Sequence, residues 1–265
     1  MTRTPASSNT RRRGEAGVTR REFNTLAGGT IASFALGGAC AGSQQAGSDG
    51  RIPARPGGTA TTVGTGQRAL GLGGSRDGSI QLPRKPAAGR LPLMVLLHGA
   101  GGSSAGILRR LGAFADEAGV AVLAPDSRNS SWDAIIGNLG PDVVFLNRAL
   151  DKVFETTAVD PARISIGGFS DGASYALTLG LINGDLFERI VAFSPGFVVR
   201  GTAHGKPRIF VSHGTADEIL PIDRSSRVIV PALQNRGYDV TFKHFDGGHD
   251  IPPFIAKDGM KFAAE

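Results

Sequence analysis

The sequence predicts an α/β domain in which a mostly parallel central sheet is covered by helices on both faces. From about residue 90 onward, short apolar runs alternate with longer segments of helical spacing. This alternation is typical of parallel strands that are joined by crossover helices. The chain of 265 residues is 40% hydrophobic, which is enough to bury a large core.

Six apolar runs are predicted to form the sheet, because each is short and bounded by turn residues. They cover residues 93–97, 120–124, 163–167, 189–193, 208–212 and 239–245, with short antiparallel edge strands expected at 70–72 and 79–82. The covering helices are expected at 105–118, 142–156, 173–182, 225–236 and 252–264. Only 14 residues separate the strands at 189–193 and 208–212, so no large lid domain is expected.

The first 41 residues are predicted to be an export signal. They hold six arginines and two glutamates, and residues 19–23 resemble the bacterial twin-arginine motif ahead of a weakly apolar stretch at 26–39. Cys40 lies either in a lipoprotein cleavage box, where it would carry a lipid anchor, or in an ordinary A-x-A cleavage site. We therefore expect a periplasmic, cell-surface or extracellular protein.

Residues 42–66 are rich in Gly, Ser, Thr, Ala and Pro, which predicts a flexible linker. The folded domain is then expected at 67–265. Of the net charge of +6, the first 41 residues carry +4, and the remainder mixes both signs without a basic run. Nucleic-acid binding is excluded on this ground, because it needs a clustered basic face.

Ligands of an open α/β sheet bind at the carboxyl ends of its strands, so the residues that follow each strand are the functional candidates. The strand at 163–167 runs into the pattern G-x-S-x-G at 168–172, and a helix rich in Ala and Leu follows. In this context the serine stands at the tip of a sharp turn with its hydroxyl exposed. Ser170 is therefore the predicted nucleophile.

A glycine-rich loop at 98–103 follows the strand at 93–97. Such a loop lets backbone N–H groups approach an oxyanion. The expected donors are the N–H groups of Ala100 and Asp171, with that of Gly101 as the alternative to Ala100. A phosphate-binding loop would need a G-K-[ST] sequence, which is missing here.

The general base and its acid partner are predicted from position. His249 lies in a glycine-rich loop after the last strand, and this position favours it over His98, His204, His213 and His244. Asp217 follows the strand at 208–212 and is favoured over Glu218 and Asp223. The order Ser170, Asp217, His249 along the chain is the order found in α/β-hydrolases.

The segments 96–103, 167–173, 212–222 and 247–253 resemble motifs of α/β-hydrolases. The resemblance covers about 90–260 and is to the phospholipase/carboxylesterase family and the related secreted polyhydroxybutyrate depolymerase and feruloyl esterase-like proteins. It implies a carboxylic ester hydrolase that forms an acyl-enzyme on Ser170 and needs no metal or organic cofactor. Thioesterase-like members commonly carry Gln after the nucleophile, where this chain has Asp171.

Four residues are expected in loops at the rim of the site, as the lining of an acyl pocket or as ordinary packing. They are Trp132, Phe197, Ile219 and Leu220. A rim without a lid suits small-molecule or polymeric esters. A peptidase, acyltransferase or perhydrolase on the same triad, or a binding protein without activity, are the alternatives.

Overall fold

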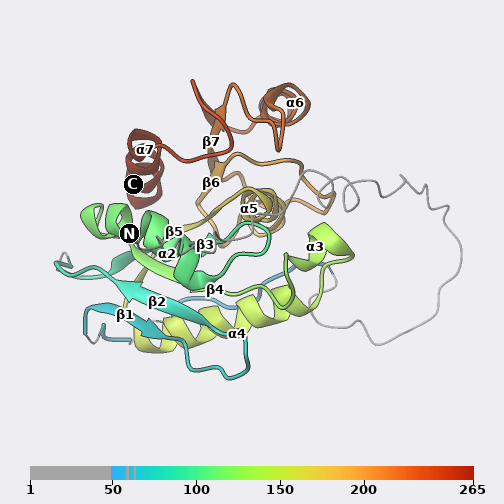
Figure 1. Cartoon of the computed structure of the whole chain (residues 1–265). Helices are drawn as coiled ribbons and strands as arrows, with labels where there is room; N and C mark the ends of the chain where they lie inside the picture. The colour runs from blue at the N-terminus through green and yellow to red at the C-terminus, as the bar shows by residue number, and fades with distance from the viewer. Residues whose placement is uncertain (1–48, 58–59, 63, 87) are drawn as a thin grey trace, which may run out of the picture. The chain divides into compact units, whose positions relative to one another are not determined.

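The computed structural model describes residues 49–57, 60–62, 64–86 and 88–265, and the expected export signal and Cys40 lie outside these residues (Figure 1). The described residues form one sheet with helices on both faces. The strands are β1 (Gly66–Ala69), β2 (Gly78–Leu82), β3 (Leu91–Leu97), β4 (Ala121–Pro125), β5 (Val159–Phe169), β6 (Arg189–Phe193), β7 (Arg208–Gly214) and β8 (Val240–Phe245).

The order of the strands across the sheet is β1-β2-β4-β3-β5-β6-β7-β8. Neighbouring strands from β4 across the sheet to β8 pair in parallel. At one edge of the sheet, β1 pairs antiparallel with β2, and β2 pairs antiparallel with β4. The predicted fold class is confirmed. The first edge strand was expected at 70–72 but lies at Gly66–Ala69, whose residues are largely exposed. An edge strand of this kind needs no apolar run, and Leu70 is instead buried just beyond it.

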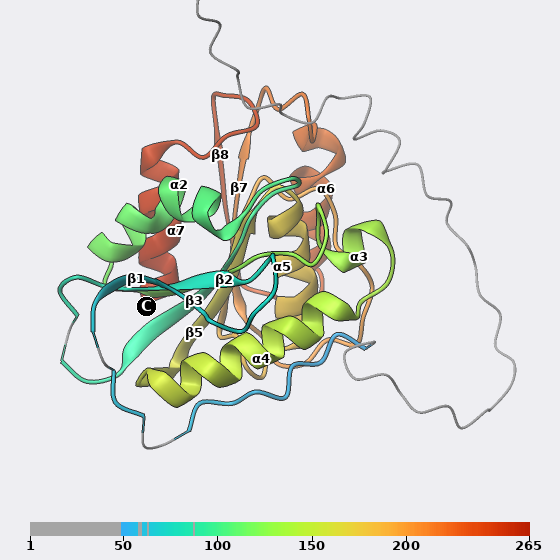
Figure 2. The ribbon, with the colours of Figure 1, turned by 60° about the horizontal axis from the view of Figure 1, so that its bottom comes forward.

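Two layers of helices cover the sheet. One layer holds α2 (Ser104–Glu117) and α7 (Pro253–Ala264), and the other holds α4 (Pro141–Thr156), α5 (Asp171–Ile182) and α6 (Ser226–Gln234), as Figure 2 shows. Two short helices, α3 (Asp133–Ile136) and η1 (Ile222–Arg224), lie in connecting segments. The described residues include no helix of the length and apolarity that a membrane crossing requires.

The central strand β3 shows how the sequence fills both layers. Its side chains alternate, so that Leu93 and Val95 pack into the core under α4 and α5 while Met94 packs into the core under α2 and α7. All seven residues of β3 are buried. A strand buried on both faces reads as a continuous apolar run, which is why it was predicted so clearly.

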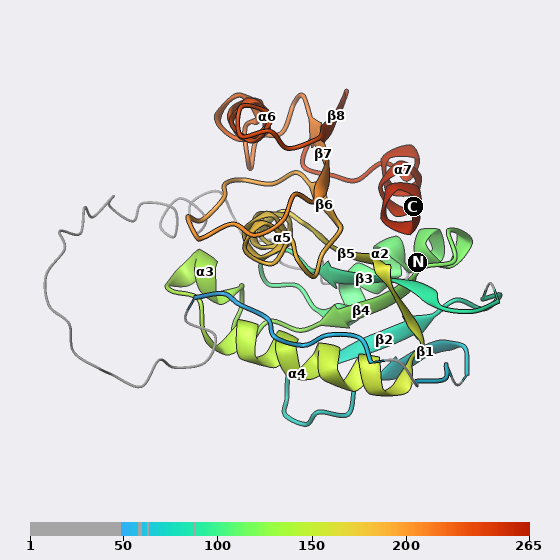
Figure 3. The same ribbon diagram turned by 180° about the vertical axis from the view of Figure 1, so that it is seen from behind.

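The expected linker at 42–66 is wrong over part of its length. Residues 49–55 lie along α4 and the end of α5 (Figure 3), where the Ile52 side chain is fully buried. The Ile52 N–H donates to Asn183 Oδ1 at 2.8 Å, and Arg51 pairs with Asp185 at 2.8 Å. One buried isoleucine and its polar neighbours fix a segment whose composition predicts flexibility.

Candidate active site

The turn between β5 and α5 carries Ser170 in a strained conformation. Its φ of 58° and ψ of −119° lie where a side chain is rarely found, and α5 begins at the next residue. Strain of this kind costs roughly 1–3 kcal/mol and is held by the surrounding structure. Ser170 donates its N–H to Phe193 O at 2.9 Å, which fixes the turn to the end of β6.

The two glycines of the turn permit this close packing. A Cβ on Gly168 would lie 2.5 Å from the carbonyl carbon of Gly172. A Cβ on Gly172 would collide with the carbonyl oxygens of Leu97 and His98, at the end of β3. Both positions therefore exclude a side chain, which is the reason for the G-x-S-x-G spacing.

The structure brings the three predicted triad residues together from three different loops. His249 Nε2 lies 2.9 Å from Ser170 Oγ, and His249 Nδ1 lies 2.6 Å from Asp217 Oδ2. With Nδ1–H donating to the carboxylate, Nε2 accepts from the serine hydroxyl. The Asp217 side chain is fully buried, whereas 15% of the His249 side chain is exposed, so solvent reaches the histidine but not the acid.

Glycines also bring the His249 loop against the end of β7. A Cβ on Gly214 would collide with the carbonyl oxygens of Gly247 and Gly248, so the two loops touch through their backbones. Ala216 donates its N–H to Gly247 O at 2.9 Å. The loop that holds the histidine is thereby fixed to the loop that holds the aspartate.

Asp217 is held ionised by its neighbours. Burial opposes the charge, but hydrogen bonds from His213, His249 and the Leu220 N–H outweigh it and hold the pKa of Asp217 well below its usual range. The Ile219 N–H donates to the same carboxylate at 2.9 Å. An acid that stays ionised can stabilise a positive charge on His249.

His213, which was considered from the sequence only as an alternative to His249, is a second histidine on this carboxylate. Its fully buried Nε2 lies 2.7 Å from Leu220 O and 3.1 Å from Asp217 Oδ2. Its Nδ1 lies 2.7 Å from Ser226 Oγ, which can donate to it. The spacing of four residues between His213 and Asp217 is the signal that could have indicated this contact.

The two expected oxyanion donors lie in the loop after β3 and at the start of α5. A Cβ on Gly99 would lie 3.3 Å from Ser170 Cβ, so this loop passes directly beside the turn. The Gly101 N–H donates to Ser130 O at 2.6 Å and is therefore engaged elsewhere. Within the described segments, the N–H groups of Ala100 and Asp171 have no backbone acceptor.

The side chain of Asp171 turns away from this hole into a buried contact. Ser131 Oγ donates to Asp171 Oδ2 at 2.5 Å, and burial raises the pKa of Asp171. Ser131 follows Ser130, whose carbonyl accepts the Gly101 N–H. The segment 127–132 therefore contacts both the loop after β3 and the start of α5, which carry the two expected oxyanion donors. We call this segment the brace.

Trp132, at the end of the brace, serves as packing, which was one of the two roles expected for it, and does not line an acyl pocket. It is fully buried, its Nε1 donates to His98 O at 2.9 Å, and its ring stacks on Tyr175 at 5.3 Å. Tryptophan combines a large apolar ring with one N–H donor, and both are used here to support the loop after β3. Leu220 is also buried, whereas Phe197 and Ile219 are each 37% exposed at the edge of the site.

A buried acidic cluster beneath the brace was not identified from the sequence. Tyr175 donates its hydroxyl to Asp133 Oδ1 at 2.7 Å, and Asp142 donates its N–H to Asp133 Oδ2 at 2.9 Å. Asp142 in turn accepts the N–H groups of Arg128 and Asp133. Burial raises the pKa of Asp142 to about 6.

The site also contains an aromatic and cationic wall. The ring of Phe169 lies 4.7 Å from that of His249, and the Arg110 guanidinium lies 4.4 Å from the Phe169 ring centre. Arg110 forms an ion pair with Asp250, next to the histidine. No group of three or more His, Cys, Asp or Glu side chains in the described part of the chain is placed to hold a metal ion.

Both a family profile and a curated relative link this chain to esterases. The profile of the phospholipase/carboxylesterase family matches residues 145–264. A putative esterase, NocK, from Nocardia uniformis subsp. tsuyamanensis is 31% identical over 189 residues, which are 65% of this chain and 53% of the relative. The chain spans about half the length of the curated relatives it matches.

Solved structures of esterases share the fold. The crystal structure of esterase PE8 is 25% identical, with a TM-score of 0.56 over 69% of this chain and 97% of the other. A Bacillus cereus carboxylesterase, at 21% identity and a TM-score of 0.57, covers 71% of this chain and 93% of its own. At this identity, the similarity to the Bacillus cereus carboxylesterase shows a shared fold and no more.

Proposed function

We propose that this chain, which has the α/β-hydrolase fold and matches the phospholipase/carboxylesterase profile over residues 145–264, is a serine esterase. It cleaves carboxylic esters through an acyl-enzyme on Ser170. The observation that carries the proposal is the continuous hydrogen-bond chain from Ser170 through His249 to Asp217. This arrangement can activate a hydroxyl that is otherwise a weak nucleophile.

In the first half of the reaction, Ser170 Oγ attacks the ester carbonyl carbon while His249 Nε2 takes the hydroxyl proton. Asp217 fixes the tautomer of His249 and stabilises the imidazolium that forms. The N–H groups of Ala100 and Asp171 hold the negative oxygen of the tetrahedral intermediate. Loss of one such donor typically costs about 10²–10³ in rate.

Collapse of this intermediate breaks the ester C–O bond, and His249 returns the proton to the leaving alcohol. A water molecule then attacks the acyl-enzyme as His249 takes its proton. The second intermediate releases the carboxylic acid and restores the Ser170 hydroxyl. Each step uses the same hydrogen-bond chain, so no further acid or base is required.

The substrate class follows from the edge of the site. Ile219, whose N–H donates to Asp217, presents a partly exposed apolar side chain beside the triad, and η1 and α6 directly follow the acid loop. We infer that the site takes small-molecule or polymeric esters that reach it from solvent. Asp171, where thioesterase-like members commonly carry Gln, favours an oxygen ester over a thioester.

Hydrolysis of p-nitrophenyl esters with acyl chains of two to twelve carbons tests this function. Replacing Ser170 by Ala should lower kcat by about 10⁴–10⁶ while the melting temperature is unchanged. A serine-directed phosphonate should label the parent protein at Ser170 and leave the variant unlabelled. Equal activity in the two proteins would refute the role of Ser170, and a folded parent that neither reacts nor labels would favour a binding protein.

We also propose that residues 1–41 export the protein by the twin-arginine route. The proposal rests on Arg20 and Arg21 ahead of a weakly apolar stretch, and on Cys40 near its end. Replacing both arginines by Lys should retain the chain in the cytoplasm. Mass spectrometry of the exported protein distinguishes a lipid on Cys40 from cleavage after Ala41; export of the double variant at the parent level would exclude this route.

A further inference from the structure

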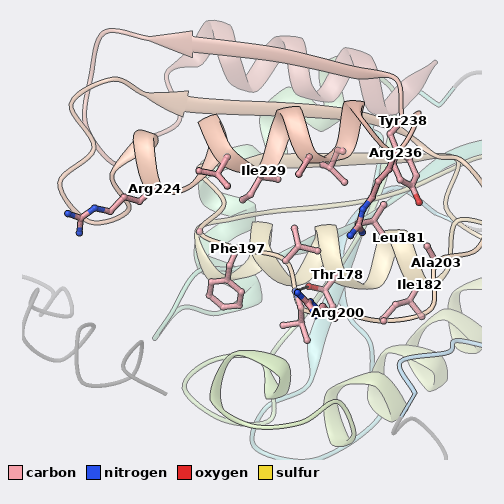
Figure 4. A pocket seen from close by; sticks show the side chains of 17 residues that line it. Thr178, Leu181, Ile182, Phe197, Arg200, Ala203, Arg224, Ile229, Arg236 and Tyr238 are labelled. Carbon is pink, nitrogen blue, oxygen red and sulfur yellow. Dashed lines mark hydrogen bonds between the residues drawn. The ribbon is translucent and has the colours of Figure 1, made fainter. Parts of the chain in front are cut away.

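A groove of about 790 Å³ lies between α5 and α6 (Figure 4). Its walls are the second half of α5, the loop at 196–203 and one side of η1 and α6. None of the triad residues lines it. Its volume lies within the range of small-molecule binding pockets.

The wall formed by the loop at 196–203 is fixed in place by two hydroxyl groups of α5. Ser174 Oγ accepts the N–H of Gly196 at 2.9 Å, and Thr178 Oγ1 accepts the N–H of Val199 at 3.1 Å. Both hydroxyls are buried. The loop has no regular secondary structure, so these bonds hold the groove open as a preformed site.

The floor of the groove is apolar and part of it is open to solvent. Leu181, Ile229 and Leu233 supply the floor. Val228, on the side of α6, is 58% exposed, and Phe197 is 37% exposed at the end nearest the acid loop. Exposed apolar side chains gathered around a hollow indicate a binding surface more strongly than scattered ones do.

The charges around the groove are of one sign. Arg200, Arg224 and Arg236 line it, and no aspartate or glutamate does. Over the described ranges, eight other arginines form ion pairs with carboxylates, whereas these three form none. Figure 4 shows Arg200 on the loop and Arg236 in the turn that follows α6, with Arg224 at the opposite end of the groove.

We propose that this groove binds an anionic amphiphile, of which a long-chain carboxylate is the simplest member. The alkyl chain lies on Leu181, Ile229 and Leu233, and the carboxylate pairs with Arg200 and Arg236. A guanidinium without a protein carboxylate can offer its donors to a ligand carboxylate as a bidentate pair. An apolar floor alone would accept a neutral chain equally well; the unpaired arginines select the anion.

Binding of decanoate, measured by titration calorimetry on the full chain carrying Ser170→Ala, tests the proposal without any turnover. Decan-1-ol is the neutral comparator of the same length. We expect decanoate to bind at least tenfold more tightly than the alcohol, with a preference that falls as salt is raised. Each added methylene should tighten binding about threefold to fourfold, as for chain burial on an apolar floor.

Variants then locate the site. Arg200→Gln/Arg236→Gln should weaken decanoate binding about tenfold and leave decan-1-ol unchanged. The matched control is Arg109→Gln/Arg148→Gln, which removes two exposed charges from α2 and α4 and should change neither affinity. Val228→Glu, at an exposed position, should also weaken decanoate selectively.

Two results would overturn the proposal. One is equal decanoate affinity in the groove and control variants. The other is equal binding of decanoate and decan-1-ol by the protein that carries Ser170→Ala alone. Because Ser170 is absent from every protein compared, failure here leaves the esterase proposal untouched, and failure of the esterase assay leaves this one untouched.

Discussion

The pH dependence of stability should carry the signature of Asp142. Its carboxylate is 1% exposed, at the start of α4, and accepts two backbone N–H groups at 2.6 and 2.7 Å. Burial, together with the neighbouring charge of Asp133, raises its pKa from the usual 3.8 to about 6. The folded protein therefore takes up a proton on Asp142 at a pH where the unfolded chain does not.

The sign and size of the effect follow from linkage. Stability falls as pH rises from about 4 to about 6, because the folded state binds the extra proton in that interval. Above about pH 6 the full destabilisation is present. The difference between 3.8 and about 6, at about 1.4 kcal/mol per pH unit, corresponds to about 3 kcal/mol.

The assay is urea unfolding between pH 4.5 and 7.5, followed by the fluorescence of Trp132, the single tryptophan, which is buried near this cluster. His98, whose pKa burial lowers, contributes the opposite slope in this interval. The informative quantity is therefore the difference between the parent and Asp142→Asn. That difference should change by about 2 kcal/mol over this range, most of it below pH 6. Asp151→Asn, an exposed change on the same helix, is the control and should leave the pH dependence of the unfolding free energy as it is in the parent. Parallel pH profiles for the parent and Asp142→Asn would refute the reasoning.

Three further perturbations test other parts of the structure. Gly172→Ala places a Cβ against two backbone carbonyls, so it should lower unfolding free energy by more than about 2 kcal/mol and abolish esterase activity, as chemical denaturation and an ester assay would show. Ser131→Ala leaves the buried Asp171 carboxylate without its hydroxyl donor, and kcat for p-nitrophenyl acetate should fall while KM is retained; an unchanged kcat would separate the brace from the reaction. Ile52→Ala should cost about 2–4 kcal/mol by urea unfolding if residues 49–55 belong to the folded domain, and a cost near zero would restore the flexible linker.

The residues of the triad were predictable because each lies in the segment that follows a predicted strand. Parallel strands place their carboxyl ends at one edge, so polar residues after β5, β7 and β8 must converge. The glycines beside Ser170 and His249 added independent support, and the structure gives Gly168 and Gly172 a steric reason. The position of Asp217 after the strand at 208–212 then favoured it over Glu218 and Asp223.

The parts that were not predictable depend on contacts between distant segments. Trp132 follows β4 just as Ser170 follows β5, yet its ring turns under α5 toward Tyr175 rather than to the rim. The direction of a side chain within a loop is set by tertiary packing, which periodicity does not report. Ile52 was missed for a related reason, since a single apolar residue in a polar segment produces no pattern.

The strained conformation of Ser170 indicates what holds the catalytic geometry. Its backbone is fixed by the bond from its N–H to Phe193 O and by the N–H groups of Ala173 and Ser174, which both donate to Ser170 O at 3.0 Å. None of these bonds involves the hydroxyl group or His249. The strain of roughly 1–3 kcal/mol is thus offset by the packing of β5, β6 and α5, and not by the triad itself. We therefore expect replacement of the serine to retain the fold, whereas a side chain at Gly172 would collide with the end of β3.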